Sequence, residues 1–257
     1  MTLPLHLVPS LAGAVPGSSV VVTGEEARHA VAVRRLRVGE RVALTEGEGT
    51  LVTGAVTSAT ARELVVEVVG RASVPEPRPR LTVVQALPKG DRGELAVELL
   101  TEIGVAAIVP WAASRSVAQW RGERASKALA RWRRTAREAA KQSRRVWFPQ
   151  VREPAATPEV AALVSVASVA VVLHEGGASP LAAVDLAPAL ADAGPADQGG
   201  PGIVLVVGPE GGLSEEELAV LAGAGGIVAR MGAEVLRTST AGVAASAAVL
   251  ARTPRWH

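Results

Sequence analysis

Two strongly apolar runs in the second half of the chain constrain the fold more than any other feature. They are VASVAVVL, residues 166–173, and IVLVVG, residues 203–208. Such runs are typical of strands that helices cover on both faces, as in parallel sheets. The strand-like pieces LTVVQAL and AAIVPW lie before them and flank RGELAVELLTEIG, which has a helical pattern with Asp91 as its expected N-cap. This alternation predicts an α/β fold with a mostly parallel sheet.

The first part of the chain has a different pattern. SSVVVTG, ERVALTEGEG, TLVTGAVTSAT and ELVVEVVG are β-rich pieces between turns, and EEARHAVAVRRLRVGE reads as a short helix that runs into a basic turn. The segment SVPEPRPR carries three prolines and is a good linker. We therefore expect a small β-barrel domain over residues 1–72, a linker over 73–80 and an α/β domain over 81–257. Residues 187–202, APALADAGPADQGGPG, are expected to form a surface loop.

Composition excludes several classes of chemistry and location. The chain has no cysteine, so it has neither a thiolate nucleophile nor Cys-ligated zinc. Its four histidines show no metal-ligand spacing, and we expect no metal site. There is no run of about 18 apolar residues and no signal-peptide pattern at the start, so we expect a cytoplasmic protein without membrane contact.

Positive charge is concentrated in one band. Residues 115–152 carry 12 basic and 2 acidic side chains, although the whole chain has a net charge of only +2. Within this band, basic residues recur every three or four positions, at 121, 124, 127, 131, 134, 137, 141 and 144. Alanines, Leu129 and Trp132 occupy the opposite face of the predicted amphipathic helix. A charged face of this kind is often merely solvated, but eight cations with so few carboxylates favour contact with nucleic acid.

The sharpest local motif is IVLVVGPEGGLSEEEL, residues 203–218. A buried strand ends in Gly208-Pro209-Glu210-Gly211-Gly212, and Ser214 with Glu217 forms a capping box for the next helix. Glycines there would let a ligand approach the backbone, although the loop could be a plain strand-to-helix turn. The acidic first turn of the helix would repel phosphate, so a cofactor poor in phosphate, such as the cationic S-adenosylmethionine, fits better than a nucleoside triphosphate.

Two further segments are candidates for the same site. In MGAEVLRTSTAGVAASAAVLAR, residues 231–252, a short strand is followed by hydroxyl side chains and a helix of alanine and valine. One of the hydroxyls could simply be an N-cap, and the apolar helix must be buried or lie at a subunit interface. His174 and Glu175 end a buried strand and could line a site, although a lone histidine is more often structural.

Taken together, these motifs resemble one family, the ribosomal RNA small subunit methyltransferase E group of the SPOUT superfamily. The matching pieces are HAVAVRRLRVGE, LPKGDRGELAVELLTEIGVAAIVPWAASRSV, REAAKQSRRVWFPQV, LHEGG, VVGPEGGLSEEE and MGAEVLRTSTA, in the order of the family. The resemblance implies a PUA-like N-terminal barrel, a trefoil-knotted C-terminal methyltransferase domain and a homodimer. It also implies S-adenosylmethionine-dependent methylation of N3 of a uridine in 16S rRNA of the small ribosomal subunit.

The resemblance also implies site residues. The expected cofactor-binding residues are Leu173, Glu175, Val207, Gly208, Glu210, Gly211, Met231, Gly232, Leu236, Arg237 and Thr238. The RNA-binding residues that the resemblance implies are Arg34, Arg35, Arg37, Lys89, Arg92, Gln142, Arg144 and Arg145, and the cationic face of the predicted amphipathic helix adds Arg134 and Arg137. The sequence departs from the family pattern at Ser239, where glutamate is common, and we expect that serine suffices there.

Methylation of N3 needs no covalent enzyme intermediate, which agrees with the absence of cysteine. The enzyme must position the two reactants and stabilise a developing uridine anion, and the target base must be flipped out of its stack. We expect Arg237 to supply the positive charge and Glu210 to accept the proton. Two alternatives remain open, ribose 2′-O-methylation by a related SPOUT enzyme and a non-catalytic rRNA-binding assembly factor.

Overall fold

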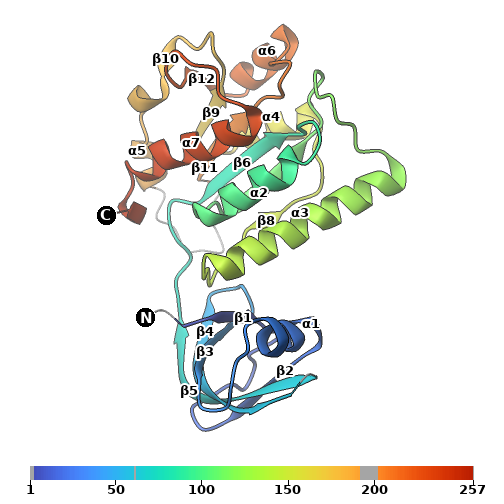
Figure 1. Ribbon diagram of the computed structural model, residues 1–257. Coiled ribbons are helices and arrows are strands. Elements are labelled where there is room, and N and C mark those ends of the chain that lie inside the picture. Colours follow the sequence, from blue (N-terminus) through green and yellow to red (C-terminus); the bar gives the residue numbers. More distant parts are fainter. Residues whose placement is uncertain (1–2, 61, 192–201, 257) are drawn as a thin grey trace. The chain divides into compact units, whose positions relative to one another are not determined.

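The chain divides into two compact units, which are described separately. The computed structural model describes residues 3–60, 62–191 and 202–256. One unit combines Met1–Glu76 with Ala140–Phe148, and the other combines Pro77–Ala139 with Pro149–His257 (Figure 1). A segment from the middle of the sequence therefore belongs to the same unit as the N-terminal residues.

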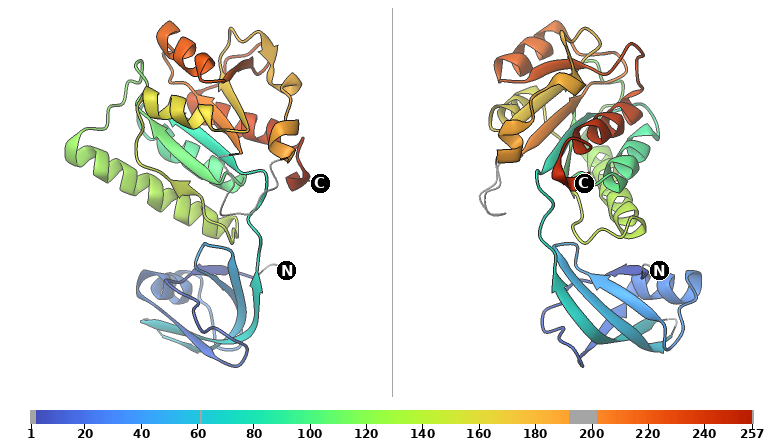
Figure 2. Two further views of the ribbon diagram at one scale, coloured as in Figure 1. Left: turned by 180° about the vertical axis from the view of Figure 1, so that it is seen from behind. Right: turned by 90° about the vertical axis from the view of Figure 1, so that its left-hand side faces the viewer.

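The N-terminal unit is built on a five-stranded sheet in the order β1-β3-β4-β5-β2. Its elements are β1 (Leu5–Leu7), β2 (Ser19–Thr23), α1 (Gly24–Arg28), the π-helical turn η1 (His29–Val33), β3 (Arg41–Thr45), β4 (Thr50–Ala59) and β5 (Glu63–Ser73). The pairing of β1 with β3 is parallel and the others are antiparallel. The sheet curls around an apolar core that includes Leu44, Val52 and Leu64 (Figure 2). The predicted β-rich pieces and the short helix before the basic turn are confirmed.

The segment Ala140–Phe148 is tied to this unit by hydrogen bonds. The Gly49 N–H donates to the carbonyl of Val146 at 3.1 Å, and the Phe148 N–H donates to that of Gly47 at 2.9 Å. The indole Nε1 of Trp147 donates to the carbonyl of Val74 at 2.8 Å. These bonds satisfy backbone groups of the β3–β4 turn and of the residue after β5.

The second unit contains a seven-stranded sheet in the order β10-β12-β9-β11-β6-β7-β8, and all of its pairings are parallel. Its strands are β6 (Leu81–Ala86), β7 (Ala107–Trp111), β8 (Gln150–Val151), β9 (Val169–Leu173), β10 (Ser179–Pro180), β11 (Ile203–Val207) and β12 (Ile227–Arg230). Its helices are α2 (Arg92–Glu102), α3 (Gly122–Gln142, of which residues 140–142 are counted with the N-terminal unit), α4 (Thr157–Ser165), α5 (Ala187–Ala191), α6 (Glu215–Gly223) and α7 (Thr238–Leu250), with 3₁₀ turns η2 (Leu181–Ala183) and η3 (Pro254–Trp256). The predicted parallel α/β fold is confirmed.

Helices cover both faces of this sheet, which explains the two apolar runs. Leu205 of β11 belongs to a core cluster with residues of α2, α3 and α7, whereas Val204 and Val206 belong to a second cluster with Val160 of α4 and Leu221 of α6. Successive side chains of β11 therefore enter different cores, and all five of its residues are buried. No described helix is long and apolar enough to cross a membrane.

Several local expectations need correction. Asp91 is at the N-cap of α2, but its side chain makes no capping hydrogen bond. The helix buries Ala96, Val97 and Leu100, whereas Leu95 is 44% exposed. The short strand expected from Met231 lies earlier, in β12. Within the predicted surface loop at 187–202, residues 187–191 form α5, and residues 192–201 lie outside the described part of the chain.

Candidate functional site

A cavity of about 540 Å³ lies at the carboxyl edge of the parallel sheet. Its walls come from the residues that end or follow β9, β11 and β12 and from the first turn of α7. Because parallel strands end at the same edge, the loops after them meet there although they are far apart in sequence. The same rule explains why LHEGG, GPEGG and MGAEVLRT contribute to one cavity.

Glycines permit the tight packing of the loop after β11. A Cβ on Gly211 would lie 3.1 Å from Cβ of Arg115 and 3.2 Å from its carbonyl oxygen. A Cβ on Gly208 would lie 3.0 Å from Cδ2 of Leu213. On the opposite loop, Gly232 has φ +85°, a conformation that favours glycine. Because these positions are glycines, the backbone of the two loops is not covered by side chains where it lines the cavity.

Glu217 anchors the loop to its neighbours. The predicted capping box is confirmed, because the Glu217 N–H donates to Ser214 Oγ at 3.1 Å and the Ser214 N–H donates to Glu217 Oε2 at 3.0 Å. Ser114 adds two donors, its N–H to Oε1 at 2.7 Å and its Oγ to Oε2 at 2.8 Å. Burial alone would raise the pKa of Glu217, but the hydrogen bonds from Ser114 and Ser214 outweigh burial and lower it.

Charges of both signs surround the cavity. Its lining includes Arg115, Arg230 and Arg237 together with Glu175, Glu210 and Glu234. Arg115 donates to the carbonyls of Gly211 and Leu213, and Arg230 donates to those of Gly177 and Ala178. The guanidinium of Arg237 has no hydrogen bond to any described residue, so it is the cavity arginine that is available to a ligand.

Glu210 connects the cavity to the loop between β6 and α2. Its Oε1 accepts a hydrogen bond from the backbone N–H of Lys89 at 3.4 Å and lies 3.6 Å from Nη1 of Arg92. These contacts orient the carboxylate. They also bring Lys89 and Arg92, two expected RNA-binding residues, to the rim of the cavity.

All eleven expected cofactor-binding residues line this cavity, and their role in binding stays a prediction. Arg115, which reaches the cavity from the loop between β7 and α3, was not among the expected cofactor-binding residues. The interpretation of one of the hydroxyl residues as the N-cap of α7 is wrong, because Arg237 occupies the N-cap position and its side chain makes no capping hydrogen bond. Ser239 is 3% exposed and is not among the residues found to line the cavity, so position 239 faces the protein interior.

The expected RNA-binding residues are distributed over several elements. Arg34, Arg35 and Arg37 are exposed in the turn after η1, and Nη2 of Arg34 donates to Oε1 of Gln142 at 3.0 Å. Arg144 is exposed and Arg145 is partly exposed, in the segment that belongs to the N-terminal unit. Arg134 and Arg137 are exposed on α3.

The positive stripe on α3 is narrower than its spacing predicts. Lys141 is 8% exposed, and its Nζ lies 2.9 Å from Oε2 of Glu26. Lys127 and Arg131 pair with Glu123 and Glu94 at 3.9 and 3.1 Å. Lys141 is therefore a buried structural cation, and the expectation that it joins an exposed stripe is wrong. Sequence spacing cannot detect Glu26 and Glu94, two carboxylates that tertiary folding brings close to this helix.

Comparisons with known proteins agree on one family. Residues 75–250 match the RNA methyltransferase domain and residues 22–69 match the RNA methyltransferase PUA domain. The chain is 45% identical over 244 residues to proteins named ribosomal RNA small subunit methyltransferase E from Mycobacterium bovis and Mycobacterium tuberculosis, covering 93% of this chain and 89% of each relative. The chain belongs to the ribosomal RNA small subunit methyltransferase E family.

A solved structure with this family name supports the assignment over the whole chain. The crystal structure of the Neisseria gonorrhoeae protein, bound to S-adenosyl methionine, is 28% identical in sequence, has a TM-score of 0.82 and covers 98% of both chains. The matched PUA domain lies within the N-terminal unit, and the matched RNA methyltransferase domain includes most of the second unit.

Proposed function

We propose that this chain transfers a methyl group from S-adenosylmethionine to N3 of a uridine in 16S rRNA of the small ribosomal subunit. The observation that carries the proposal is the meeting of LHEGG, GPEGG and MGAEVLRT around one cavity of about 540 Å³. Relatives at 45% identity carry the name of a small-subunit rRNA methyltransferase, and a relative at 28% identity binds the cofactor.

The charges and the exposed backbone of the cavity support binding of this cofactor. The carboxylates of Glu175, Glu210 and Glu234 favour the cationic sulfonium over a polyphosphate, and Gly208 and Gly211 expose backbone groups that can hold an adenine or an amino acid. When bound, S-adenosylmethionine supplies an electrophilic methyl group. The chain's own part is to hold it beside the base and to exclude water.

Two cavity residues are assigned to the chemistry of the base. Loss of the N3 proton places negative charge on the uracil ring, and Arg237, whose guanidinium has no partner among the described residues, stabilises that charge. Glu210 accepts the proton, with its carboxylate oriented by Lys89 and Arg92.

RNA binding is assigned to the exposed arginines. Those of the turn after η1, of α3 and of the segment 144–145 contact phosphates, and a homodimer in the cytoplasm is the proposed working form. Ribose 2′-O-methylation and a non-catalytic assembly role are the alternatives, and no observation on the structure favours either of them.

Identification of the product nucleoside tests the proposal. The protein is incubated with labelled S-adenosylmethionine and either 30S particles or free 16S rRNA, and the digested RNA is analysed by mass spectrometry. We expect N3-methyluridine with at least one of the two substrates. A 2′-O-methyl nucleoside would identify the first alternative. Absence of methyl transfer, together with no calorimetric binding of S-adenosylmethionine, would identify the second.

The role of Arg237 has its own prediction. Arg237→Ala is expected to lower the single-turnover rate at saturating cofactor about a hundredfold or more, as loss of a donor to a developing anion does. Arg41→Ala, which removes an exposed arginine from β3, serves as control. A near-normal rate for Arg237→Ala, with an unchanged melting temperature, would refute the assigned role.

A further inference from the structure

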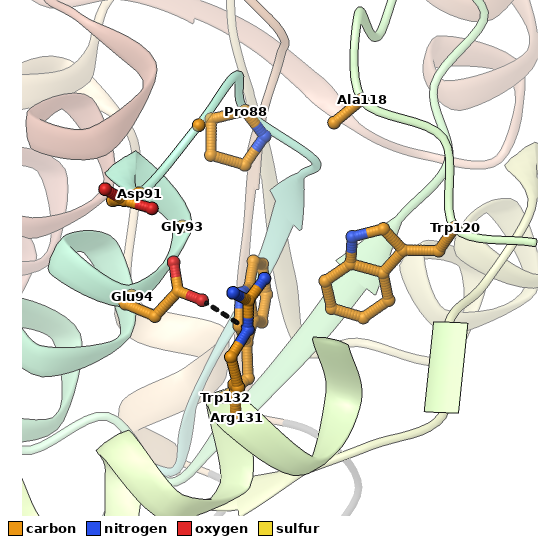
Figure 3. A pocket seen from close by; sticks show the side chains of 9 residues that line it. Pro88, Asp91, Gly93, Glu94, Ala118, Trp120, Arg131 and Trp132 are labelled. Carbon is orange, nitrogen blue, oxygen red and sulfur yellow. Dashed lines mark ion pairs between the residues drawn. The ribbon is translucent and has the colours of Figure 1, made fainter. Parts of the chain in front are cut away.

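A second, smaller cavity of about 240 Å³ lies between the N-terminus of α2, the loop before α3 and α3 itself. Its walls include two indole rings, those of Trp120 and Trp132, whose centroids are 5.0 Å apart at an interplanar angle of 80°. Figure 3 shows Glu94 and Arg131 on one side of this cavity and Trp120 on the other. Trp132 is 2% exposed and belongs to the core, whereas Trp120 is partly exposed.

The wall opposite Trp120 is polar. Oε1 of Glu94 lies 3.1 Å from Nε of Arg131, and within the described chain no partner is found for Oε2 of Glu94. Asp91, which makes no capping bond to α2, also lines the cavity. Gly93 allows α2 to pack closely against the indole of Trp132, because a Cβ at this position would lie 2.8 Å from Nε1 of Trp132. The cavity thus combines aromatic rings with carboxylate oxygens that can only accept hydrogen bonds.

One loop separates this cavity from the cofactor cavity. Lys89 and Arg92 contact Glu210 in the large cavity, while their neighbours Gly90 and Asp91 line the small one. A ligand that occupies both cavities must therefore pass over this loop. A single RNA strand with two unstacked neighbouring nucleotides fits that arrangement.

We propose that the small cavity takes one unpaired RNA base beside the methylated uridine, and that it prefers a base with an amino group over uracil. The proposal rests on the proposed function, because it assumes an RNA strand at the large cavity. Unpaired bases are recognised by stacking on aromatic rings and by hydrogen bonds to their edges. The volume of about 240 Å³ is below the range of about 300–1,000 Å³ for ligand pockets, and it suits one nucleobase rather than a whole cofactor.

The carboxylates determine the preference. Asp91 and Glu94 accept hydrogen bonds from N4 of cytosine, N6 of adenine or N2 of guanine. Uracil presents one N–H between two carbonyl oxygens, and a carboxylate repels those oxygens. The same carboxylates disfavour a phosphate group, so the cavity does not serve as an extra backbone site.

Binding of single-stranded RNA by the full chain tests the inference. The probes are fluorescein-labelled dodecamers of cytidylate, adenylate and uridylate, and the readout is anisotropy. Wild type is expected to bind the cytidylate and adenylate probes about fivefold or more tightly than the uridylate probe. Glu94→Gln, which replaces an acceptor by a donor, should bring that ratio close to one. Glu98→Gln, on the exposed face of the same helix, should leave the ratio unchanged.

The aromatic wall is tested in parallel. Trp120→Ala is expected to weaken binding of the cytidylate probe about fivefold or more, because a base–aromatic stack contributes at least that much. Trp120→Phe should retain most of the affinity, and Trp256→Ala, which removes a tryptophan that is 49% exposed elsewhere, should retain all of it. If Trp120→Ala lowers the melting temperature, its weaker binding is not used. The affinity of Trp120→Phe for the cytidylate probe and the probe preference of Glu94→Gln then test the proposal.

The outcomes separate this inference from the proposed function. Equal binding of all three probes by wild type, or a base preference that Glu94→Gln leaves intact, overturns the inference even where N3-methyluridine is produced. A base preference that depends on Glu94, in a protein that makes no methyluridine, leaves the small cavity as a base site and overturns the proposed function instead.

Discussion

Glu217 joins the first turn of α6 to Ser114, in the loop after β7, through hydrogen bonds to both of its carboxylate oxygens. Glu217→Gln replaces one of these acceptors by a donor, which faces N–H groups that cannot accept. We expect the free energy of unfolding to fall by about 1–3 kcal/mol, as for the loss of hydrogen bonds to a buried charged group. Urea unfolding at pH 7 measures the difference, and Glu216→Gln, exposed on the same helix, is the matched control.

The lowered pKa of Glu217 fixes the direction of the pH dependence. A carboxyl group with a lowered pKa in the folded state stabilises the fold above its ordinary pKa of 4.5, and this contribution is lost as the pH falls below that value. The difference between wild type and Glu217→Gln should therefore shrink as the pH is lowered from 7 to about 4. A difference that grows over this interval would contradict the assignment.

Gly211 tests whether the close packing of the loop after β11 matters for cofactor binding. Gly211→Ala places a Cβ 3.1 Å from Cβ of Arg115 and 3.2 Å from its backbone oxygen, so the loop or Arg115 must shift by a few tenths of an ångström. We expect the affinity for S-adenosylmethionine, measured by calorimetry, to fall about tenfold or more, because a shift of the loop disturbs several backbone contacts at once. Gly223→Ala at the end of α6, where an added Cβ meets no atom within 4 Å, should bind as wild type does. Equal affinities of the two variants for S-adenosylmethionine would show that the close packing at Gly211 does not matter for cofactor binding.

For single residues, the sequence predicts which of them line the large cavity better than it predicts the hydrogen bonds that each side chain makes. The eleven expected cofactor-binding residues came from the family resemblance, and all of them line the large cavity because the loops after parallel strands meet at one sheet edge. Arg115 and Trp120 were missed because the loop between β7 and α3 has no pattern of its own. Asp91 was expected to cap α2 but lines the small cavity, since tertiary contacts compete with local capping.

At the scale of elements, α3 offers a direct test of RNA binding. Arg134 and Arg137 are exposed, and their guanidinium groups have no partner among the described residues. Arg134→Glu with Arg137→Glu should weaken binding of 16S rRNA and reduce the slope of log K against log salt by about 1.4–1.8, which corresponds to two lost phosphate contacts. Arg134→Lys with Arg137→Lys keeps both charges and should keep the slope. An unchanged slope after charge reversal would mean that this face of α3 is only solvated.

Long strands and helices were predicted because their side-chain periodicity reports burial. β6 and β7 were expected from the strand-like pieces LTVVQAL and AAIVPW, β9 and β11 from the two apolar runs, and α3 from its amphipathic pattern. β8 and β10 have two residues each and carry no periodicity that could be detected. β12 was expected too late in the chain, because IVAR contains an exposed Ile227 and an exposed Arg230 and resembles a surface segment.

At the scale of the whole molecule, contacts distant in sequence set the limit of prediction. The proline-rich stretch at 73–80 predicts a division of the chain, but no local pattern indicates that Ala140–Phe148 belongs with the first 76 residues. Chain topology is equally invisible to periodicity, so the expected knot came from the family resemblance alone. The boundary of the domains at 72 and 81 stays a prediction.

The ion pair of Glu26 and Lys141 links the segment Ala140–Phe148 to the first 76 residues, and its contribution to the free energy of unfolding can be measured. Nζ of Lys141 lies 2.9 Å from Oε2 of Glu26, and Nδ1 of His6 lies 3.1 Å from Oε1. Burial alone would raise the pKa of Glu26, but the hydrogen bonds from His6 and Lys141 outweigh burial and lower it to about 2. The carboxylate therefore stabilises the N-terminal unit above pH 4.5, and this contribution is lost as the pH falls from 4.5 towards 2.

Lys141→Met removes the cation and leaves the carboxylate of Glu26 partly buried without it. We expect the free energy of unfolding to fall by about 3–5 kcal/mol in urea at pH 7. Glu26→Gln combined with Lys141→Met should be more stable than Lys141→Met alone, because no uncompensated charge remains. Arg137→Met, on the exposed side of α3, should stay within about 0.5 kcal/mol of wild type. If Lys141→Met proved as stable as this control, the pair would not hold the segment in the N-terminal unit.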